Sequence, residues 1–395
     1  MSVTAPARPS LTVQGAQAAA PAQGVPQVPF PQASRRAIEW PLSFNVTPGV
    51  APITIGPADI TPNGFMRFLD IHVSTVTPGT GSPVALPGWP FSILQNLQFI
   101  DTGGQKMDDL PGFHLFVDNY ASGSPWRADP TVAHDFSNSA TAPNFRLRIA
   151  RELFPDGKGS LPNLSGSQKY RTRLEIAPLA NLYSTAPTAA PELQIDVTSH
   201  LWLLPAPQDG GGRPQQRKPD LLGLAQYRTG FYPAISISNA QIDEQVKASG
   251  NLIKYIALFG WDSSGNPSDA IFPDPFTLRV DNNYLFSDAP LSEVIHYSDS
   301  MIQERAARLP GVLILPWNYG LDRTSGANGV SSFLATSTAT YIQVKGRQAT
   351  PTVGTMDVLV CEISTAEIDP AERAAMNNGT GTWQPAIPQN VIGGV

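Results

Sequence analysis

The chain has 395 residues, and its 26 Lys and Arg against 32 Asp and Glu give a formal net charge of -6. This balance, without a long basic block, argues against nucleic-acid binding as the main activity, because phosphate contacts need clustered Lys and Arg. Charged residues make up only 15% of the chain while Gly (33) and Pro (39) are frequent, which favours short strands and turns over long helices.

The chain contains one cysteine, Cys361, so no intrachain disulfide forms and a secreted, disulfide-stabilised protein is excluded. The first residues, MSVTAPARPS, lack the apolar segment of a signal peptide, and no run of 18 apolar residues occurs. The sequence therefore predicts folding in a reducing cytoplasm, with neither a secretion signal nor a membrane-spanning helix.

Residues 1–36 are predicted to form an N-terminal arm, because Ala, Pro, Gln and Gly dominate and large apolar side chains are rare. Its charged residues are Arg8, Arg35 and Arg36, so the arm is basic on an acidic protein. Such an arm suits an anionic surface, although three arginines are also common in a solvated tail. Residues 369–395 are predicted to form a C-terminal arm, and we expect both arms to order against a neighbour.

Between the arms, apolar and polar residues alternate with the period of a half-buried strand. The segment KYRTRLEI (169–176) places four side chains on one face: Tyr170, Thr172, Leu174 and Ile176. Further strands, most with one buried face, are predicted at 194–204, 276–280, 339–346 and 355–363. The chain is therefore predicted to be mainly β.

The predicted folded part consists of two domains with similar segments in the same order. The Pro, Gly and Gln cluster at 205–220 is predicted to be a linker between domains at 37–204 and 221–368. Paired segments occur in the same order in both halves: FMRFLDIHVSTV with LIKYIALFGWD, LQFID with TLRVD, and a helical stretch with His114 or His296. These pairs predict two copies of one β domain, each with a single helix after its third main strand.

The segment FIDTGGQKMDDLPGFHLFVDNY (99–120) contains residue types that are also found in active sites. The glycines are predicted to form a turn, and Asp108, Asp109 and Pro111 to start a helix. That helix presents an apolar stripe formed by Phe113, Phe116, Val117 and Tyr120. His114 and Asp118 are predicted to lie on its opposite, solvated face, so we assign them no catalytic role.

No other group of residues indicates chemistry. His72 with Asp70, and His200, are predicted to be half-exposed on strands, and Cys361 to be a buried, inert thiol. Asp274 with the segment 281–283 contains calcium-binding residue types without the spacing of a calcium loop. The sequence therefore predicts no catalytic residue, no metal site and no cofactor.

Several segments together, in order, resemble a known viral family. They are NGFMRFLDIHVST, LQNLQFIDTGGQK, GFHLFVDNYASGSP, SQKYRTRLEIAP and ELQIDVTSHLWLLP in the first half, and NLIKYIALFGWDSSG, LSEVIHYSDSMIQERAARLPGV and YIQVKGRQATPTVGTMDVLVCEIS in the second. In this order they are similar to the double jelly-roll major capsid proteins of tectivirus-like bacteriophages, which are icosahedral phages with an internal membrane. The resemblance covers about residues 38–368. The Pro-rich N-terminal arm departs from the helix-forming arm associated with that family.

The resemblance implies an all-β chain of two tandem eight-stranded jelly rolls, with one short helix in each and extended arms at both ends. It implies homotrimers with a pseudo-hexameric outline that tile an icosahedral virion shell over an internal membrane. The expected partners are other copies of the chain, penton and minor capsid or membrane proteins, and the internal membrane. The loops at 77–90 and 316–330 are expected to face outward or to contact neighbouring trimers.

Two other functions fit a pair of jelly rolls. A carbohydrate-active enzyme would place acids and tryptophans in a cleft between the rolls, but such enzymes are usually secreted and often contain disulfides. A glycan-binding phage module would favour repeats and exposed aromatic side chains without two arms. The absence of a predicted signal peptide and the single cysteine argue against the enzyme.

Overall fold

The computed structural model describes most of the chain between the two predicted arms. The described residues are 26–122, 136–153, 157–219, 224–228, 235–237, 241–247, 251–281, 283–301, 308–316, 334–336 and 341–365. The C-terminal arm, Arg8 and most of the loop at 316–330 lie outside them.

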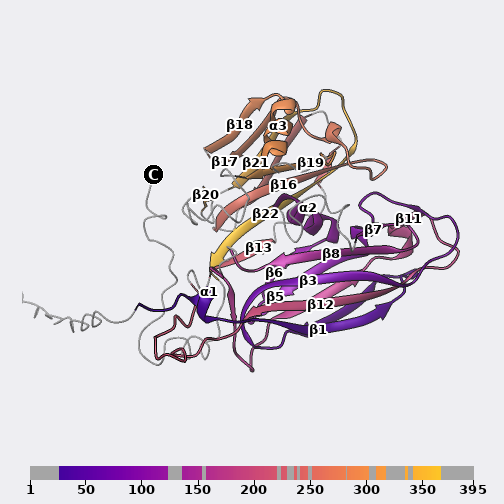
Figure 1. Ribbon diagram of the computed structural model, residues 1–395. Helices are drawn as coiled ribbons and strands as arrows, with labels where there is room; N and C mark the ends of the chain where they lie inside the picture. The colour runs from indigo at the N-terminus through magenta and orange to yellow at the C-terminus, as the bar shows by residue number, and fades with distance from the viewer. Residues whose placement is uncertain are drawn as a thin grey trace, which may run out of the picture.

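The main strands of the first half lie in two sheets packed face to face, and within this half neighbouring strands are antiparallel (Figure 1). The strands of the first sheet are, in spatial order, β1 (Arg36–Val46), β12 (Glu192–Trp202), β3 (Gly64–Thr77) and β8 (Pro143–Ala150). Those of the second are β2 (Ile53–Asp59), β10 (Arg171–Ile176), β5 (Leu94–Ile100) and β6 (Lys106–Leu110). When the eight main strands are numbered 1 to 8 along the chain, the two sheets have the strand orders 1-8-3-6 and 2-7-4-5, which define a jelly roll.

The second half repeats this order strand for strand. One sheet contains β13 (Leu224–Arg228), β22 (Gly354–Thr365), β16 (Leu252–Asp262) and β19 (Val312–Pro316). The other contains β15 (Gln241–Lys247), β21 (Tyr341–Arg347), β17 (Phe276–Val280) and β18 (Asn283–Ala289). The duplication predicted from the sequence is confirmed, since β3 corresponds to β16 and β5 to β17.

Shorter elements complete both rolls. In the first they are α1 (Phe30–Ala33), β4 (Val84–Ala85), η1 (Phe91–Ile93), β7 (Ser137–Asn138), β9 (Leu161–Asn163), η3 (Leu179–Asn181) and β11 (Tyr183–Thr185). In the second they are β14 (Ile235–Ile237), η4 (Asp269–Ile271) and β20 (Leu334–Ala335).

Each roll has one longer helix, α2 (Gly112–Ser122) or α3 (Leu291–Met301), between its fifth and sixth strands. The prediction that this helix follows the third main strand was wrong, because more than one strand before the helix, including β6 or β18, was not recognised in each half. Asp108 and Asp109 lie inside β6 and do not cap the helix. The two histidines are not equivalent either, since His114 is the third residue of α2 and His296 the sixth residue of α3.

Burial follows the predicted alternation where one sheet face meets the core. In β10, Thr172, Leu174 and Ile176 are buried while Arg171 and Arg173 are partly exposed. The rule fails in β16, β19 and β22, whose residues are buried on both faces. These strands belong to the sheet of the second roll that also packs against the first roll, so the segment at 355–363 is an exception to the one buried face predicted for most strands.

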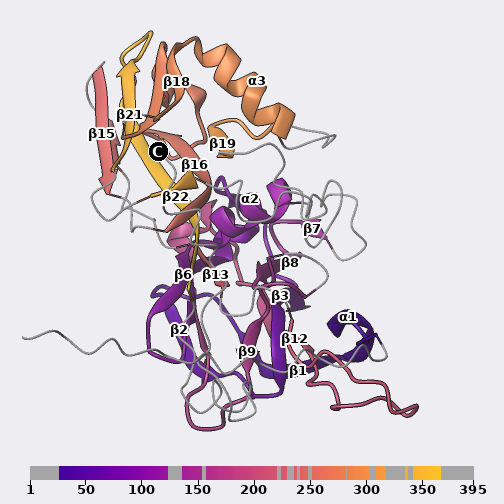
Figure 2. The same cartoon turned by 90° about the vertical axis from the view of Figure 1, so that its left-hand side faces the viewer.

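The two rolls share one extended sheet. Strand β13 of the second roll pairs in parallel with β6 of the first at Arg228 and Asp108, so a sheet of the first roll continues into a sheet of the second. Helix α2 lies beside this junction, between the rolls (Figures 1 and 2). The junction brings together the polar side chains described next.

Candidate functional site

Helix α2 is buried on nearly all sides, as expected of a helix between two packed layers. It starts after Pro111, and Gly112 lies so close to the Phe91 carbonyl oxygen that a Cβ atom would collide with it. Phe116 stacks on Phe91 of the first roll with ring centroids 3.9 Å apart. Phe113 lies 5.4 Å from the Trp261 ring of the second roll, so the helix joins the two cores.

Four charged side chains, one of them in α2, are buried at the junction of the rolls, and their charges sum to zero. The Asp108 carboxylate lies 2.6 Å from the Arg151 guanidinium and 3.2 Å from that of Arg228. The Arg228 Nε atom also lies 3.1 Å from the Asp118 carboxylate. Because each charge faces an opposite charge, the cluster avoids the cost of an isolated buried ion.

Neutral partners complete the cluster. The Tyr255 hydroxyl of β16 donates a hydrogen bond to Asp118, and Arg151 donates to the Gln226 carbonyl oxygen at 3.1 Å. The first roll supplies Asp108, Asp118 and Arg151, while the second supplies Arg228, Gln226 and Tyr255. The cluster therefore fixes how the rolls dock.

Burial and charge shift the pKa values of this cluster. Burial lowers the pKa of Arg151, against the opposing attraction of Asp108. Burial also tends to lower the pKa of Arg228, but the Asp118 and Asp108 carboxylates raise it well above its ordinary value. Burial and the neighbouring Asp118 raise the pKa of Tyr255 well above its ordinary value. The tyrosine therefore remains a hydrogen-bond donor at neutral pH.

The prediction that His114 and Asp118 lie on a solvated helix face was wrong. Both are buried, with 3% and 4% of their surface exposed. The His114 Nε2 atom lies 3.3 Å from Asp357 of β22, and the His114 ring packs against Phe259 at 3.9 Å. The face is buried because the second roll covers it, which the sequence of the helix alone does not reveal.

The other predicted side chains have structural partners. The Asp70 carboxylate, predicted to lie on the polar strand face with His72, is buried and binds Arg148 through two contacts of 2.7 and 2.8 Å. His72 and His200 are partly buried, as predicted, and Cys361 is buried in β22, where burial raises the pKa of its thiol.

The candidate calcium residues serve local roles in the fold. Asp274 accepts a hydrogen bond from the Leu291 amide at the start of α3, and Asp281 accepts one from the Tyr341 amide. In the described part of the chain, no group of three or more His, Cys, Asp or Glu is placed to bind a metal. None of its helices is both long and apolar enough to cross a membrane.

The described end of the N-terminal arm packs on the chain itself. Phe30 of α1 is 1% exposed and makes edge contacts with Phe65 and Trp202, at centroid distances of 5.4 and 6.0 Å. Val28 pairs with Gln215 of the segment between the rolls. The exposed Arg35 and Arg36 follow, and the Arg36 guanidinium lies 5.0 Å from the Trp202 ring centroid.

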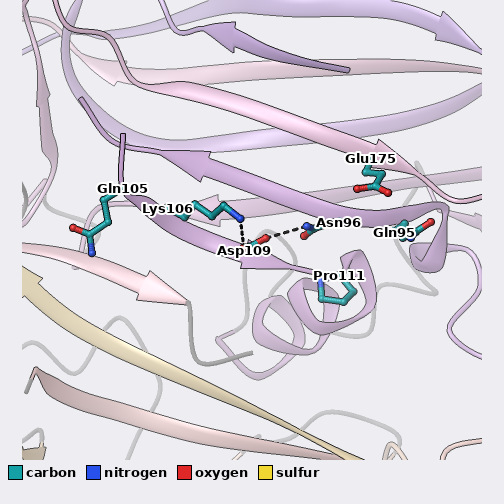
Figure 3. Close-up of a pocket in the computed structure, with 7 residues that line it drawn as sticks. All are labelled: Gln95, Asn96, Gln105, Lys106, Asp109, Pro111 and Glu175. Carbon is teal, nitrogen blue, oxygen red and sulfur yellow. Dashed lines mark hydrogen bonds and ion pairs between the residues drawn. The ribbon is translucent and has the colours of Figure 1, made fainter. Parts of the chain in front are cut away.

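A polar pocket of about 680 Å³ lies where β5, β6 and β10 meet the start of α2 (Figure 3). It is lined by Gln95, Asn96, Gln105, Lys106, Asp109, Pro111 and Glu175. Asp109 accepts bonds from Lys106 at 2.7 Å and Asn96 at 2.9 Å. Its carboxylate is thus held in place by side chains of the pocket wall.

Sequence reasoning missed Arg151 and Arg228. Arg151 follows the same alternation as Phe145, Leu147 and Ile149, whose side chains enter the core. An arginine at the next inward-facing position of this strand could have indicated a buried ion pair. The sequence around Arg228 contains no comparable signal.

Comparison with solved structures identifies the architecture. No family model and no curated protein matches the sequence. The STIV major capsid protein matches with a TM-score of 0.54 at 13% identity, covering 84% of this chain and 97% of that chain. The chain has a double jelly-roll fold.

Two further structures share this double jelly roll. The atomic structure of Sulfolobus Turreted Icosahedral Virus matches with a TM-score of 0.54 at 15% identity, covering 87% of this chain and 96% of that chain. VP54 of PBCV-1 matches with a TM-score of 0.51 at 11% identity, covering 84% and 94%. The double jelly roll implied by the sequence resemblance is therefore confirmed.

Proposed function

We propose that the chain is a major capsid protein, a structural component of an icosahedral virion rather than an enzyme. The observation that carries this proposal is the pair of complete jelly rolls joined through one sheet, an architecture that covers 97% of the STIV major capsid protein. The buried charge cluster supports it, because its side chains bind one another across the rolls.

The proposed assembly is a homotrimer. Three chains with two similar rolls each present six similar walls, so the trimer has a pseudo-hexameric outline that packs into a shell. We propose that these trimers tile an icosahedral shell over an internal membrane. Their partners are neighbouring trimers, penton proteins and minor capsid or membrane proteins, and the chain is made in the cytoplasm of a bacterial host.

The proposed division of the chain follows the predicted boundaries. The arms at 1–36 and 369–395 flank rolls at 37–204 and 221–368, which are joined by the linker 205–220. Arg8, Arg35 and Arg36 give the N-terminal arm a positive charge, which supports a contact with an anionic membrane or an acidic neighbour.

Light scattering of the purified chain tests the trimer. The expected particle mass is three times 42.3 kDa, or about 127 kDa, with larger closed shells at high concentration. Electron microscopy of the same sample is expected to show pseudo-hexameric particles. A monodisperse 42.3 kDa monomer with glycan turnover would overturn the proposal.

Deletion of residues 1–25 tests the arm separately. The deletion stops before Val28 and Phe30, whose contacts hold the chain end to the first roll. We expect trimers to persist while shell closure or membrane association is impaired. An unchanged yield of closed particles would refute the role of the arm.

A further inference from the structure

The polar pocket of about 680 Å³ beside α2 is shaped by a β-bulge in its wall. In the pairing of β10 with β5, Glu175 lies opposite Asn96 and Ile176 lies opposite Leu94. Gln95 is therefore an extra residue of β5 without a cross-strand partner, and it lines the pocket together with Glu175. Bulges of this kind turn a side chain out of the regular sheet and are frequent beside functional sites.

One side of the pocket wall is already paired within itself. The Asp109 carboxylate accepts hydrogen bonds from Lys106 at 2.7 Å, Asn96 at 2.9 Å and Gln98 at 3.0 Å. The Asn96 side-chain oxygen in turn accepts the Leu97 amide at 2.8 Å. The charges of Lys106 and Asp109 cancel, so these groups are not the ones that select a ligand.

Glu175 and Gln95 present oxygen atoms that the fold does not use. Glu175 is half-buried, and among the residues that the structure describes its carboxylate forms no ion pair and no hydrogen bond. No dashed line reaches it in Figure 3. The Gln95 Oε1 atom is buried and likewise has no hydrogen-bond partner in the described part of the chain. Arg173, the next outward-facing residue of β10, lies opposite Gln98 and is not part of the pocket lining.

These features restrict the class of ligand. The lining contains one lysine against two carboxylates, a net charge of -1, which disfavours an anion. A calcium ion needs six to eight oxygen ligands, whereas no group of three or more His, Cys, Asp or Glu in the described chain is placed to bind a metal. Among the described lining residues there is no aromatic ring on which a sugar could stack. An organic cation with several N–H donors satisfies the unused oxygen atoms.

We propose that this pocket binds a small alkylammonium ion. Its ammonium group pairs with the Glu175 carboxylate and donates a hydrogen bond to Gln95 Oε1, because hydrogen bonds between charged groups are the strongest in such a site. Its alkyl chain lies against the ring of Pro111, the apolar residue of the lining. The bound ion thus joins β10 to the bulge of β5. This inference goes beyond the proposed function, since it concerns a small ligand and not assembly.

Isothermal titration calorimetry of the full-length chain with 1,4-diaminobutane tests the proposal. The wild type is expected to show one saturable site per chain, and the uncharged analogue butane-1,4-diol is expected not to bind. Glu175→Gln keeps the shape of the side chain and removes its charge, so Kd is expected to rise about tenfold. Glu293→Gln is the matched control, because it removes one exposed carboxylate from α3 of the second roll and changes the net charge equally.

A second variant is expected to bind more tightly. Lys106→Met takes the lysine from the lining and changes its net charge from -1 to -2. Kd for 1,4-diaminobutane is therefore expected to fall about threefold. A variant that fails to fold cannot produce this gain, and circular dichroism of each variant checks folding.

Several results would overturn the inference. Equal weakening by Glu175→Gln and Glu293→Gln would show diffuse attraction of a diamine to a chain with a net charge of -6. Equal binding of the diol would show a site for hydroxyl groups instead. An absence of saturable binding to the wild type, or an unchanged Kd in Lys106→Met, would also contradict it. None of these results depends on whether the chain assembles, so the proposed function is tested separately.

Discussion

Replacing Asp118 by alanine removes one of the two carboxylates that neutralise the arginines buried between the rolls. Asp118 is 4% exposed, and its partners are Arg228 at 3.1 Å and the Tyr255 hydroxyl. Without it the cluster of two aspartates and two arginines carries one uncompensated positive charge. Breaking a buried pair in this way costs about 3–5 kcal/mol. We therefore expect the free energy of unfolding to fall by about that amount.

Guanidinium unfolding followed by tryptophan fluorescence measures this loss, since Trp261 lies within 5.4 Å of the Phe113 ring of α2. The double variant Asp118→Ala with Arg228→Met is expected to be more stable than Asp118→Ala alone, because it removes the unpaired charge as well. Asp196→Ala is the control, as its hydrogen bond to Ser43 lies on the surface. A loss below about 0.5 kcal/mol for Asp118→Ala would refute the reasoning.

Three further outcomes are expected. Burial lowers the pKa of His200 more than Asp70 raises it, so the midpoint of its NMR titration is expected below 6.5, and a midpoint above 6.5 would contradict this. The contribution of the neutral His200 ring to the free energy of unfolding is complete above pH 6.5 and is lost as the pH falls through the folded-state pKa. Burial raises the pKa of Asp109, but bonds from Lys106 and neighbouring amides outweigh it and lower the pKa below 3.8. The contribution of the ionised Asp109 to the free energy of unfolding is therefore present above pH 3.8 and is lost as the pH falls through its folded-state pKa. The difference in unfolding free energy between the wild type and Asp109→Asn is expected to shrink in acid, and a constant difference would contradict this. Phe30→Ala is expected to speed proteolytic cleavage near α1 by about tenfold, while equal cleavage rates would show that the Phe30 contacts do not hold the segment.

The sequence predicted the parts of the fold that local pattern controls. Alternation located strands such as β10 and β12, and similar segments at 65–76 and 252–262 indicated the duplication. It did not indicate β6, because two adjacent aspartates in KMDDL suit a helix start better than a strand. Asp108 is tolerated there because Arg151 and Arg228 neutralise it, and those contacts are between residues distant in the chain.

The candidate site was harder to predict for the same reason. His114 and Asp118 have the spacing of a polar helix face, and only the packing of the second roll turns that face inward. Arg228 lies 110 residues beyond Asp118 and contacts it across the junction. A single sequence without its relatives contains no record of such a pairing.

The sheet shared through β6 and β13 has a consequence for the proposed shell. The two rolls cannot tilt against each other without separating β13 from β6 and exposing the ion cluster between them. If the chain is a capsid protein, each copy therefore acts as one rigid unit. The curvature of the proposed shell would then arise at the contacts between chains and not within a chain.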